Sequence, residues 1–320
     1  MRPTRAITPW LFLAPALLVF GFAVLLPMVL TIGYSFTAWN GFGPMTFVGL
    51  DNYLTAAADP IFRDSFVHVS LYIAATLVLE VLAGLVLAGI VSALGGRLWF
   101  RVAIFAPVML PMVVVAVLWS FVYDPDFGLV NATLGAVGLD ELQRVWLGDP
   151  STALAAVSVV SGWVYAGFYM MIFYAAFRQV PQEVIEAARL DGASELDLFR
   201  RIKVPIIRAA VWVGVLLCVT GGFQGFDLFF VLTNGGPYGA TEIPTTYLVK
   251  TVFRNGEVGY GSAMAVVLTA IVLAVGLVYA RISRRQPAAV RPTRASGDDL
   301  LIAPSPVQVP TGVASSESTG

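Results

Sequence analysis

The sequence predicts an all-α integral membrane protein with six transmembrane helices and both termini in the cytoplasm. Hydrophobic residues make up 58% of the chain and charged residues only 12%, which is far from the composition of a soluble domain. Long stretches without any charged side chain recur along the chain, and the basic residues gather on one side of them. Together these three observations favour a protein that crosses the membrane several times.

A helix needs about 20 mainly apolar residues to cross a membrane, and six segments meet this requirement. They cover residues 10–36, 68–94, 102–123, 152–176, 209–233 and 260–281. The first segment has the basic flank of a signal peptide, but its apolar run is longer than a cleavable core and no small-residue cleavage site closes it. We therefore expect it to be retained as the first span.

The basic residues predict the orientation of these spans. Of the 19 Lys and Arg residues, all but Arg63, Arg144, Lys250 and Arg254 fall on one side. Because basic residues are enriched in cytoplasmic loops, this side and both termini are predicted to be cytoplasmic. A missed span would mix the two sets, so the asymmetry also supports the count of six.

The spans divide the chain into three predicted regions. Residues 1–67 hold the first span and the first extracytoplasmic loop, and residues 68–285 hold the main transmembrane domain. Residues 286–320 are rich in Pro, Ser, Ala and Gly and lack aromatic residues. Such a segment buries too little apolar surface to offset its ordering entropy, so a disordered cytoplasmic tail is expected.

The most charged part of the chain is the loop PQEVIEAARLDGASELDLFRRIKVPII, residues 181–207. Pro181 suits the first turn of a helix, and Glu183 and Glu186 then lie near the positive end of the helix dipole. Gly192 follows Asp191 and can adopt the left-handed conformation that a C-terminal cap requires. These features predict a short cytoplasmic helix that ends at this glycine.

A second helix is expected directly after the first. Ser194, with Asp197 three residues later, resembles a capping box that begins a helix, and Pro205 is expected to end it. The apolar side chains of this helix-turn-helix module could pack on the chain's own spans. The small residues Ala187 and Ala188 shift the balance towards docking of another protein, because they let its surface approach the helix backbone.

Two stretches of the sequence resemble a known family. The segment EAARLDGASELDLFRRIKVPII resembles the EAA motif of permease subunits of binding-protein-dependent ATP-binding-cassette (ABC) importers, with matches at Glu186, Ala187, Ala188, Gly192, Ile202 and Pro205. The segment LTNGGPYGATEIPTTYLVKTVFRNGEVGYGSAMAVVL resembles the Thr-x-Gly-Gly-Pro and Gly-Tyr-Gly-x-Ala stretches of sugar permeases in the maltose and glycerol-phosphate uptake group. The resemblance covers roughly residues 68–284, and Val204 stands where the family often has leucine.

The resemblance implies a MetI-like transmembrane domain, residues 68–285, that imports a sugar or oligosaccharide across the bacterial inner membrane. It implies a second permease subunit, most often a different chain, two cytoplasmic ATPase subunits and an extracytoplasmic solute-binding protein. In that family the EAA loop forms a coupling helix that contacts the ATPase. The implied ATPase-coupling residues are Glu183, Glu186, Ala187, Ala188, Asp191, Gly192, Ile202 and Pro205.

The chain itself is not expected to bind the nucleotide. A phosphate-binding P-loop needs a lysine directly after glycine, and neither Lys203 nor Lys250, the only lysines, follows one. ATP is therefore expected on the partner subunits, and this chain is expected to need no cofactor and to bind no nucleic acid.

Two acidic residues fall inside the predicted spans, where charges are costly and often functional. Asp227 follows Gly221 and Gly225, which allow close helix packing, and lies one turn after Gln224. Gln224 and Asp227 could face a hydrated cavity and accept hydrogen bonds from hydroxyl groups, or form a structural contact between spans. For Glu80 the structural alternative is favoured, because its sequence neighbours are apolar.

Sugar sites usually pair hydrogen bonds with an aromatic side chain against the sugar ring. The fourth span offers Trp163 and Tyr169 for this role, although most aromatics in such a span serve packing or anchoring at the interface. After the fifth span, Gly235, Gly236 and Pro237 form either a plain turn or, by the family resemblance, part of the surface that faces the binding protein.

Two other classes of function fit the sequence less well. An ion-coupled secondary transporter would work without an ATPase, but such carriers place ionisable groups and broken helices near the middle of the membrane, and only two acids qualify here. A membrane enzyme would need a cluster of His, Cys or carboxylate residues. Cys218 and His68 are the only residues of their types, so neither catalytic residues nor a metal site are expected.

Overall fold

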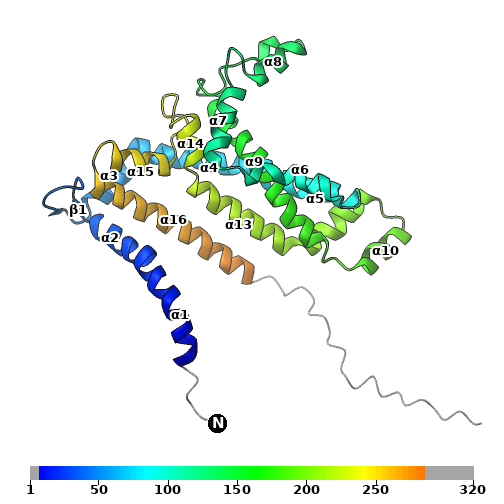
Figure 1. The fold of residues 1–320 in the computed structure, drawn as a ribbon, viewed down its shortest axis with the longest axis horizontal. Helices are drawn as coiled ribbons and strands as arrows, with labels where there is room; N and C mark the ends of the chain where they lie inside the picture. The colour runs from blue at the N-terminus through cyan, green and yellow to red at the C-terminus, as the bar shows by residue number, and fades with distance from the viewer. Residues whose placement is uncertain (1–6, 285–320) are drawn as a thin grey trace, which may run out of the picture. The chain divides into compact units, whose positions relative to one another are not determined.

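The computed structural model describes the backbone of residues 7–284 and the side chains of residues 12–282. The predicted tail, residues 286–320, and the first residues of the chain lie outside this range. Within it the chain is almost entirely helical (Figure 1), and a small antiparallel hairpin pairs β1, Thr37–Ala38, with β2, Thr46–Phe47. The fold class predicted from the sequence is thus confirmed as all-helical with membrane-compatible helices.

Four helices are long and apolar enough to cross a membrane, and two bent helix pairs raise this number to six if each pair counts as one span. The first long helix joins α1, Ile7–Phe20, through a π-helical turn to α2, Leu26–Tyr34. The others are α4, Pro60–Thr76, continued through a π-helical turn by α5, Ala83–Ala93; α9, Ala153–Phe177; and α16, Val258–Arg284. The helices predicted at 152–176 and 260–281 are confirmed to within a few residues.

The second long helix begins eight residues before its predicted start at residue 68. Asp59 caps it, because its carboxylate accepts hydrogen bonds from the amides of Ile61 and Phe62, at 2.9 and 3.3 Å. Pro60 occupies the first helical position, where its missing N–H costs nothing. The predicted start lies later because the first turns of this helix carry two charged residues, Arg63 and Asp64.

The third predicted span, residues 102–123, is not one helix. It consists of α6, Leu98–Phe105, a 3₁₀ turn at Ala106–Met109, and α7, Met112–Val122, and the two helices meet at an angle of 96°. Leu110 is extended, with φ −80° and ψ 140°, as expected for a residue that precedes a proline. Pro111 therefore separates the two helices.

The fifth predicted span, residues 209–233, is also interrupted. Helix α13, Arg208–Gln224, ends at Gly225, which is extended, and α14, Asp227–Leu232, follows after Phe226. The predicted continuous helix is wrong at this point because Gly225 leaves the helical conformation, and the break brings Asp227 to the start of a new turn.

The module of residues 181–207 has the predicted helix-turn-helix form. Helix α10, Gln182–Leu190, ends with Gly192 at φ +84°, and the amide of Ala193 donates to the carbonyl of Ala188 at 2.9 Å. Ser194 accepts from the amide of Asp197 at 3.2 Å and so caps the next helix. Both caps predicted from the sequence are confirmed.

The predicted stop at Pro205 is wrong. The second helix runs from Glu195 to Ile206 through α11, Glu195–Asp197, a π-helical turn at Leu198–Lys203, and α12, Val204–Ile206. Because the π-helical turn ends just before Pro205, the proline stands in the first turn of α12, where its missing N–H is tolerated. The chain instead bends by 75° at Ile207, before α13.

Shorter helices lie between the long ones along the chain. They are α3, Asp51–Ala58; α8, Leu129–Ala136; a 3₁₀ turn at Asp140–Leu142; and α15, Pro244–Phe253. In Figure 1, β1, α3 and α15 lie together, and α10 lies at the opposite end of the long helices.

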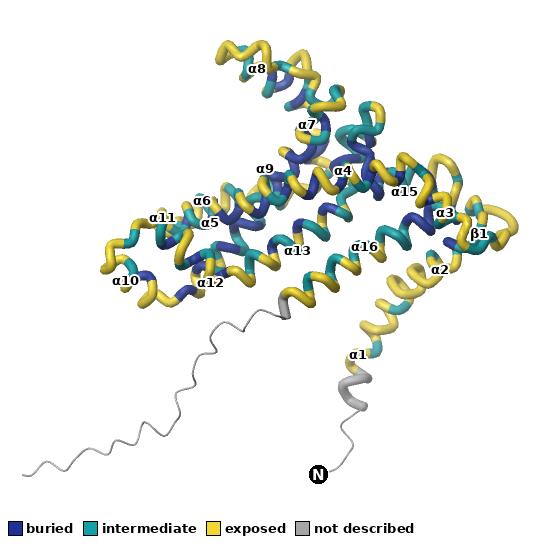
Figure 2. Tube along the Cα trace, turned by 180° about the vertical axis from the view of Figure 1, so that it is seen from behind, coloured by how far each residue is buried: buried dark blue, intermediate teal, exposed yellow. Residues whose placement is uncertain are grey.

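Helix α9 forms the centre of the packed structure. In its most apolar window 61% of the residues are buried, against 0% in the first long helix and 11% in α16. Figure 2 shows this contrast as dark blue along α9 and yellow along α1 and α2. The first helix therefore presents its apolar side chains outward, as a helix does when it faces lipid or a partner subunit.

Candidate functional site

A cavity of about 390 Å³ lies among α4, α7, α9, α13 and α14. Its volume is within the range of small-molecule sites, about 300–1,000 Å³. The break between α13 and α14 forms part of its wall, together with Gly221, Gly222 and Gly225. A hydrated solute can therefore meet irregular backbone as well as side chains in this cavity.

One wall of the cavity is a chain of hydrogen bonds between two long helices. The hydroxyl of Tyr72 on α4 donates to the Ser161 oxygen at 2.8 Å, and the Ser161 hydroxyl donates to Glu80 at 2.7 Å. Only 5% of Glu80 is exposed. Buried polar groups require partners of this kind, and the partner of Glu80 comes from α9.

Sequence analysis missed this partnership because it looked only at the neighbours of Glu80 along the chain. The π-helical turn Leu77–Leu82 carries Glu80, and Gly162 on α9 lies directly against Leu79. The absence of a side chain at Gly162 lets the two helices approach closely. Ser161 beside that glycine is the signal in the sequence that could have identified the contact.

Asp227 and Gln224 face the same cavity from the break between α13 and α14. Both side chains are exposed, and within the described residues no hydrogen bond or ion pair engages the carboxylate of Asp227. The break itself is held by the hydroxyl of Thr245, which donates to the Gly225 carbonyl at 2.5 Å. The carboxylate of Asp227 is thus accessible to a solute in the cavity.

Aromatic side chains complete the lining. Tyr165, Phe168 and Tyr169 come from α9 and Phe226 from the break. Trp163 is absent from the lining and packs edge-on against Trp119, with 5.7 Å between ring centroids. The structure therefore brings together Gln224, Asp227 and Tyr169 from the predicted solute path, but not Trp163, which points to another face of α9.

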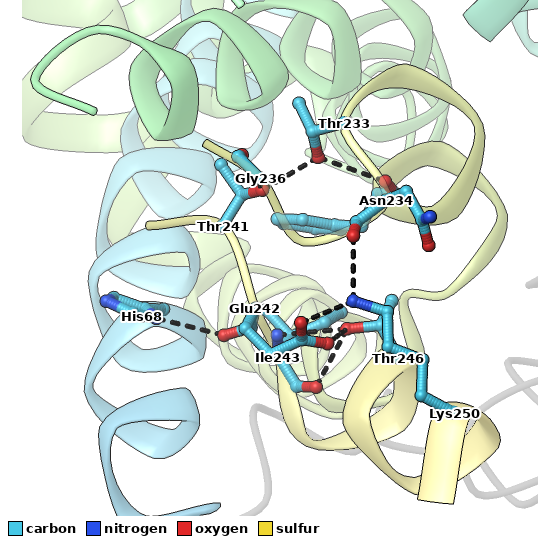
Figure 3. A network of polar contacts seen from close by, with 10 residues as sticks. His68, Thr233, Asn234, Gly236, Thr241, Glu242, Ile243, Thr246 and Lys250 are labelled. Atoms are coloured by element: carbon cyan, nitrogen blue, oxygen red, sulfur yellow. Dashed lines mark hydrogen bonds and ion pairs between the residues drawn. The ribbon is translucent and has the colours of Figure 1, made fainter. Parts of the chain in front are cut away.

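A polar network next to α15 holds the loop that contains Gly235, Gly236 and Pro237 (Figure 3). Lys250 donates to the Asn234 carbonyl at 2.7 Å and pairs with Glu242. Thr246 donates to the other carboxylate oxygen of Glu242 at 2.6 Å. These contacts connect the loop to α15.

The same network fastens this loop to α4. The His68 ring nitrogen Nδ1 donates to the Glu242 carbonyl at 2.9 Å. The hydroxyl of Thr241 lies 2.6 Å from the Gly236 carbonyl and 2.7 Å from the Thr233 hydroxyl. The single histidine thus links the loop to α4.

In the helix-turn-helix module of residues 181–207, buried and exposed residues are clearly separated. Ile185 and Leu198 are buried against the long helices, whereas Glu183, Glu186 and Ala187 are exposed. The exposed apolar residues Val184, Leu190 and Leu196 lie near these acids in the sequence, and Leu190 is 89% exposed. The module therefore keeps an outward surface that the described part of the chain does not cover. The other predicted coupling residues are Ala188 and Ile202, which are half-buried, and Asp191, Gly192 and Pro205, which are exposed.

The module is joined to α5 at two points. The ring of Phe199 lies directly over Gly89, and Lys203, 6% exposed, donates to the Ser92 hydroxyl at 3.2 Å. An ion pair of 2.7 Å between Arg189 and Glu195 also links its two helices. A displacement of α10 would consequently reach α5 through packed atoms.

Comparison with known proteins gives a consistent result. The family described as "Binding-protein-dependent transport system inner membrane component" matches residues 80–287. The chain is 40% identical over 275 residues to the probable ABC transporter permease protein YurN of Bacillus subtilis, covering 85% of this chain and 94% of that one. It is 30% identical over 280 residues to the probable starch degradation products transport system permease protein AmyD of Thermoanaerobacterium thermosulfurigenes, covering 87% and 94%.

The fold also resembles that of a solved structure. A chain of the bacterial alginate ABC transporter, in complex with alginate pentasaccharide-bound periplasmic protein, matches 89% of this chain and 98% of its own length with a TM-score of 0.78. The sequence identity is 21%, so this likeness concerns the fold alone.

Proposed function

The chain belongs to the family of inner membrane components of binding-protein-dependent transport systems, and we propose that it is a permease subunit through which an ABC importer moves a carbohydrate across the bacterial inner membrane. The cavity carries this proposal. It combines hydroxyl and carboxylate groups with aromatic rings, which is the chemistry that sugar hydroxyls and the apolar faces of sugar rings require. The name of the relative AmyD, which refers to starch degradation products, supports the same class of solute.

The proposed topology has six spans and both termini in the cytoplasm; α6 and α7 together form the third span, and α13 with α14 forms the fifth. The distribution of Lys and Arg residues supports this orientation. It assigns the module of α10 to α12 to the cytoplasmic side and the loop at residues 233–242 to the outer side. The interruption of the fifth span at Gly225 then lies where irregular backbone is tolerated, because it lines a cavity.

We further propose that the module docks on an ATPase subunit and transmits its closure to α5. The exposed EAA residues Glu186 and Ala187 and the uncovered apolar side chains beside them support this role. The loop around Gly236 would then present a surface to a solute-binding protein. A second permease subunit, expected to be a different chain, would cover the exposed apolar helices and complete the solute path, and ATP would act only through the two ATPase subunits.

The proposal is tested by reconstituting the permease pair with its ATPases in proteoliposomes and measuring uptake of labelled maltose and other sugars. Uptake should require ATP on the ATPase side and the binding protein on the other. Uptake that persists without ATPase subunits, driven by a proton or sodium gradient, would instead identify an ion-coupled carrier and refute the proposal.

A further inference from the structure

The inference drawn here rests on the proposed function and narrows its substrate class. Among the described residues, the cavity lining contains two acidic side chains, Glu80 and Asp227, and no Lys, Arg or His. Anion sites in proteins are formed by Arg and Lys side chains or by clustered backbone amides. The side chains of this cavity therefore carry acidic groups and not the basic groups that bind anions.

The hydrogen-bonding pattern points the same way. The Tyr72 and Ser161 hydroxyls already donate within the wall, each towards Glu80, so their oxygens are left as acceptors. The carboxylate of Asp227 is an acceptor as well and is exposed in the cavity. Hydroxyl or ammonium donors of a solute can therefore bind the carboxylate of Asp227, whereas a carboxylate or a phosphate cannot.

The positions of Glu80 and Asp227 indicate which of the two acids determines the selectivity for the solute. Glu80 is buried and held by Ser161, whereas Asp227 lies at the interruption of the fifth span without a partner among the described residues. An entering anion would approach the carboxylate of Asp227, and like charges repel each other. Asp227 is thus the residue best placed to exclude it.

We infer that this cavity selects neutral or amino-bearing sugars and rejects acidic ones such as uronates and sugar phosphates, with Asp227 as the residue that determines this selectivity. The polar wall of Tyr72, Ser161 and Glu80 would receive sugar hydroxyls, and the Tyr169 ring would contact an apolar sugar face.

The test measures sugar binding to the complete purified transporter without its binding protein, so that selectivity of the binding protein does not enter. Isothermal titration would use three disaccharides: neutral maltose, amino-bearing chitobiose and acidic digalacturonate. The wild type should bind maltose or chitobiose at least about tenfold more tightly than digalacturonate. Asp227→Asn should narrow this ratio, and Asp227→Lys should reverse it in favour of digalacturonate.

A matched control is Asp126→Lys, which makes the same charge change at an exposed acid outside the cavity lining and should leave the order of the three sugars unchanged. Co-purification of the ATPase shows that each variant is assembled. If digalacturonate binds the wild type as tightly as the other sugars, or if Asp227→Lys keeps the wild-type order, the selectivity is wrong while the carbohydrate function stands. If none of the three sugars binds, the carbohydrate assignment is itself refuted and the selectivity falls with it.

Discussion

The carboxylate of Asp59 joins three elements. It caps α4 and accepts hydrogen bonds from the hydroxyls of Tyr247 on α15, at 2.6 Å, and Tyr260 on α16, at 2.7 Å. Burial opposes its ionisation, but the hydrogen bonds from both tyrosines and from the Phe62 and Ile61 amides outweigh burial and hold the pKa of Asp59 below its usual value. The ionised form is therefore the one that stabilises this junction.

This predicts a specific dependence of stability on pH. Because the pKa of Asp59 is lowered on folding, its contribution is complete above the unfolded value of about 3.9 and is lost as the pH falls through the lowered pKa. Asp59→Asn should lower the free energy of unfolding at pH 7 by about 1–3 kcal/mol and reduce the loss of stability in acid. Thermal unfolding in detergent from pH 7 to pH 3 measures both effects. Equal unfolding temperatures for variant and wild type across this range would contradict the assignment.

At the level of elements, the contact between the helix-turn-helix module and α5 can be tested by mutation. An alanine at Gly89 would place its Cβ against the ring of Phe199, whereas a Cβ at Gly276, a helical glycine of α16, meets no atom within 4 Å. Both changes remove a helix-destabilising glycine, a difference of about 1 kcal/mol in favour of alanine. Gly276→Ala therefore serves as the matched control.

Gly89→Ala should reduce solute-stimulated ATP hydrolysis several-fold while the ATPase still co-purifies, because Phe199 must move and the module is displaced from α5. Gly276→Ala should behave as wild type. The measurement is ATP hydrolysis by the reconstituted transporter with and without solute and binding protein. Normal stimulation in the Gly89 variant would show that this contact does not transmit the ATPase closure.

The turn of the module gives a second prediction at this scale. Gly192 has φ +84° with open space around it, so valine there would be strained by its backbone conformation alone, at a cost of about 1–3 kcal/mol. Gly192→Val should misdirect the helix after it and weaken retention of the ATPase on an affinity column. Gly138 has φ +76° and also has open space around it, but the proposed topology places it on the other side of the membrane. Gly138→Val should therefore retain the ATPase normally. Equal retention by both variants would mean that the module is only a surface loop.

The success of the sequence-based prediction depended on how local each signal was. The caps at Gly192 and Ser194 were predictable because each rests on a few adjacent residues. The same reasoning failed for Pro205, where the preceding π-helical turn changed the position that the proline occupies. The contact of Ser161 with Glu80 joins residues 81 positions apart. Only the packing of α9 against the long helix Pro60–Ala93 brings them together.

At the level of the whole molecule, the six-span topology remains to be tested. In a Cys218→Ser background, Glu141→Cys and Leu190→Cys place single thiols at exposed positions that the topology assigns to opposite sides of the membrane. A membrane-impermeant maleimide added to intact cells should label the Glu141→Cys variant and reach Leu190→Cys only after the cells are opened. Labelling of both from outside would overturn the proposed orientation.

The helix from Pro60 to Ala93 has 34 residues, and this length has a consequence for how deep the chain sits in lipid. At 1.5 Å per residue it extends about 51 Å, whereas the hydrocarbon layer is about 30 Å thick. Even a tilt of about 40°, the upper end of the observed range, leaves about 9 Å of its axial height outside that layer. Its first turns, with exposed Arg63 and Asp64, can therefore stand among the lipid headgroups. The Asp59 junction would then lie in the headgroup layer and outside the hydrocarbon.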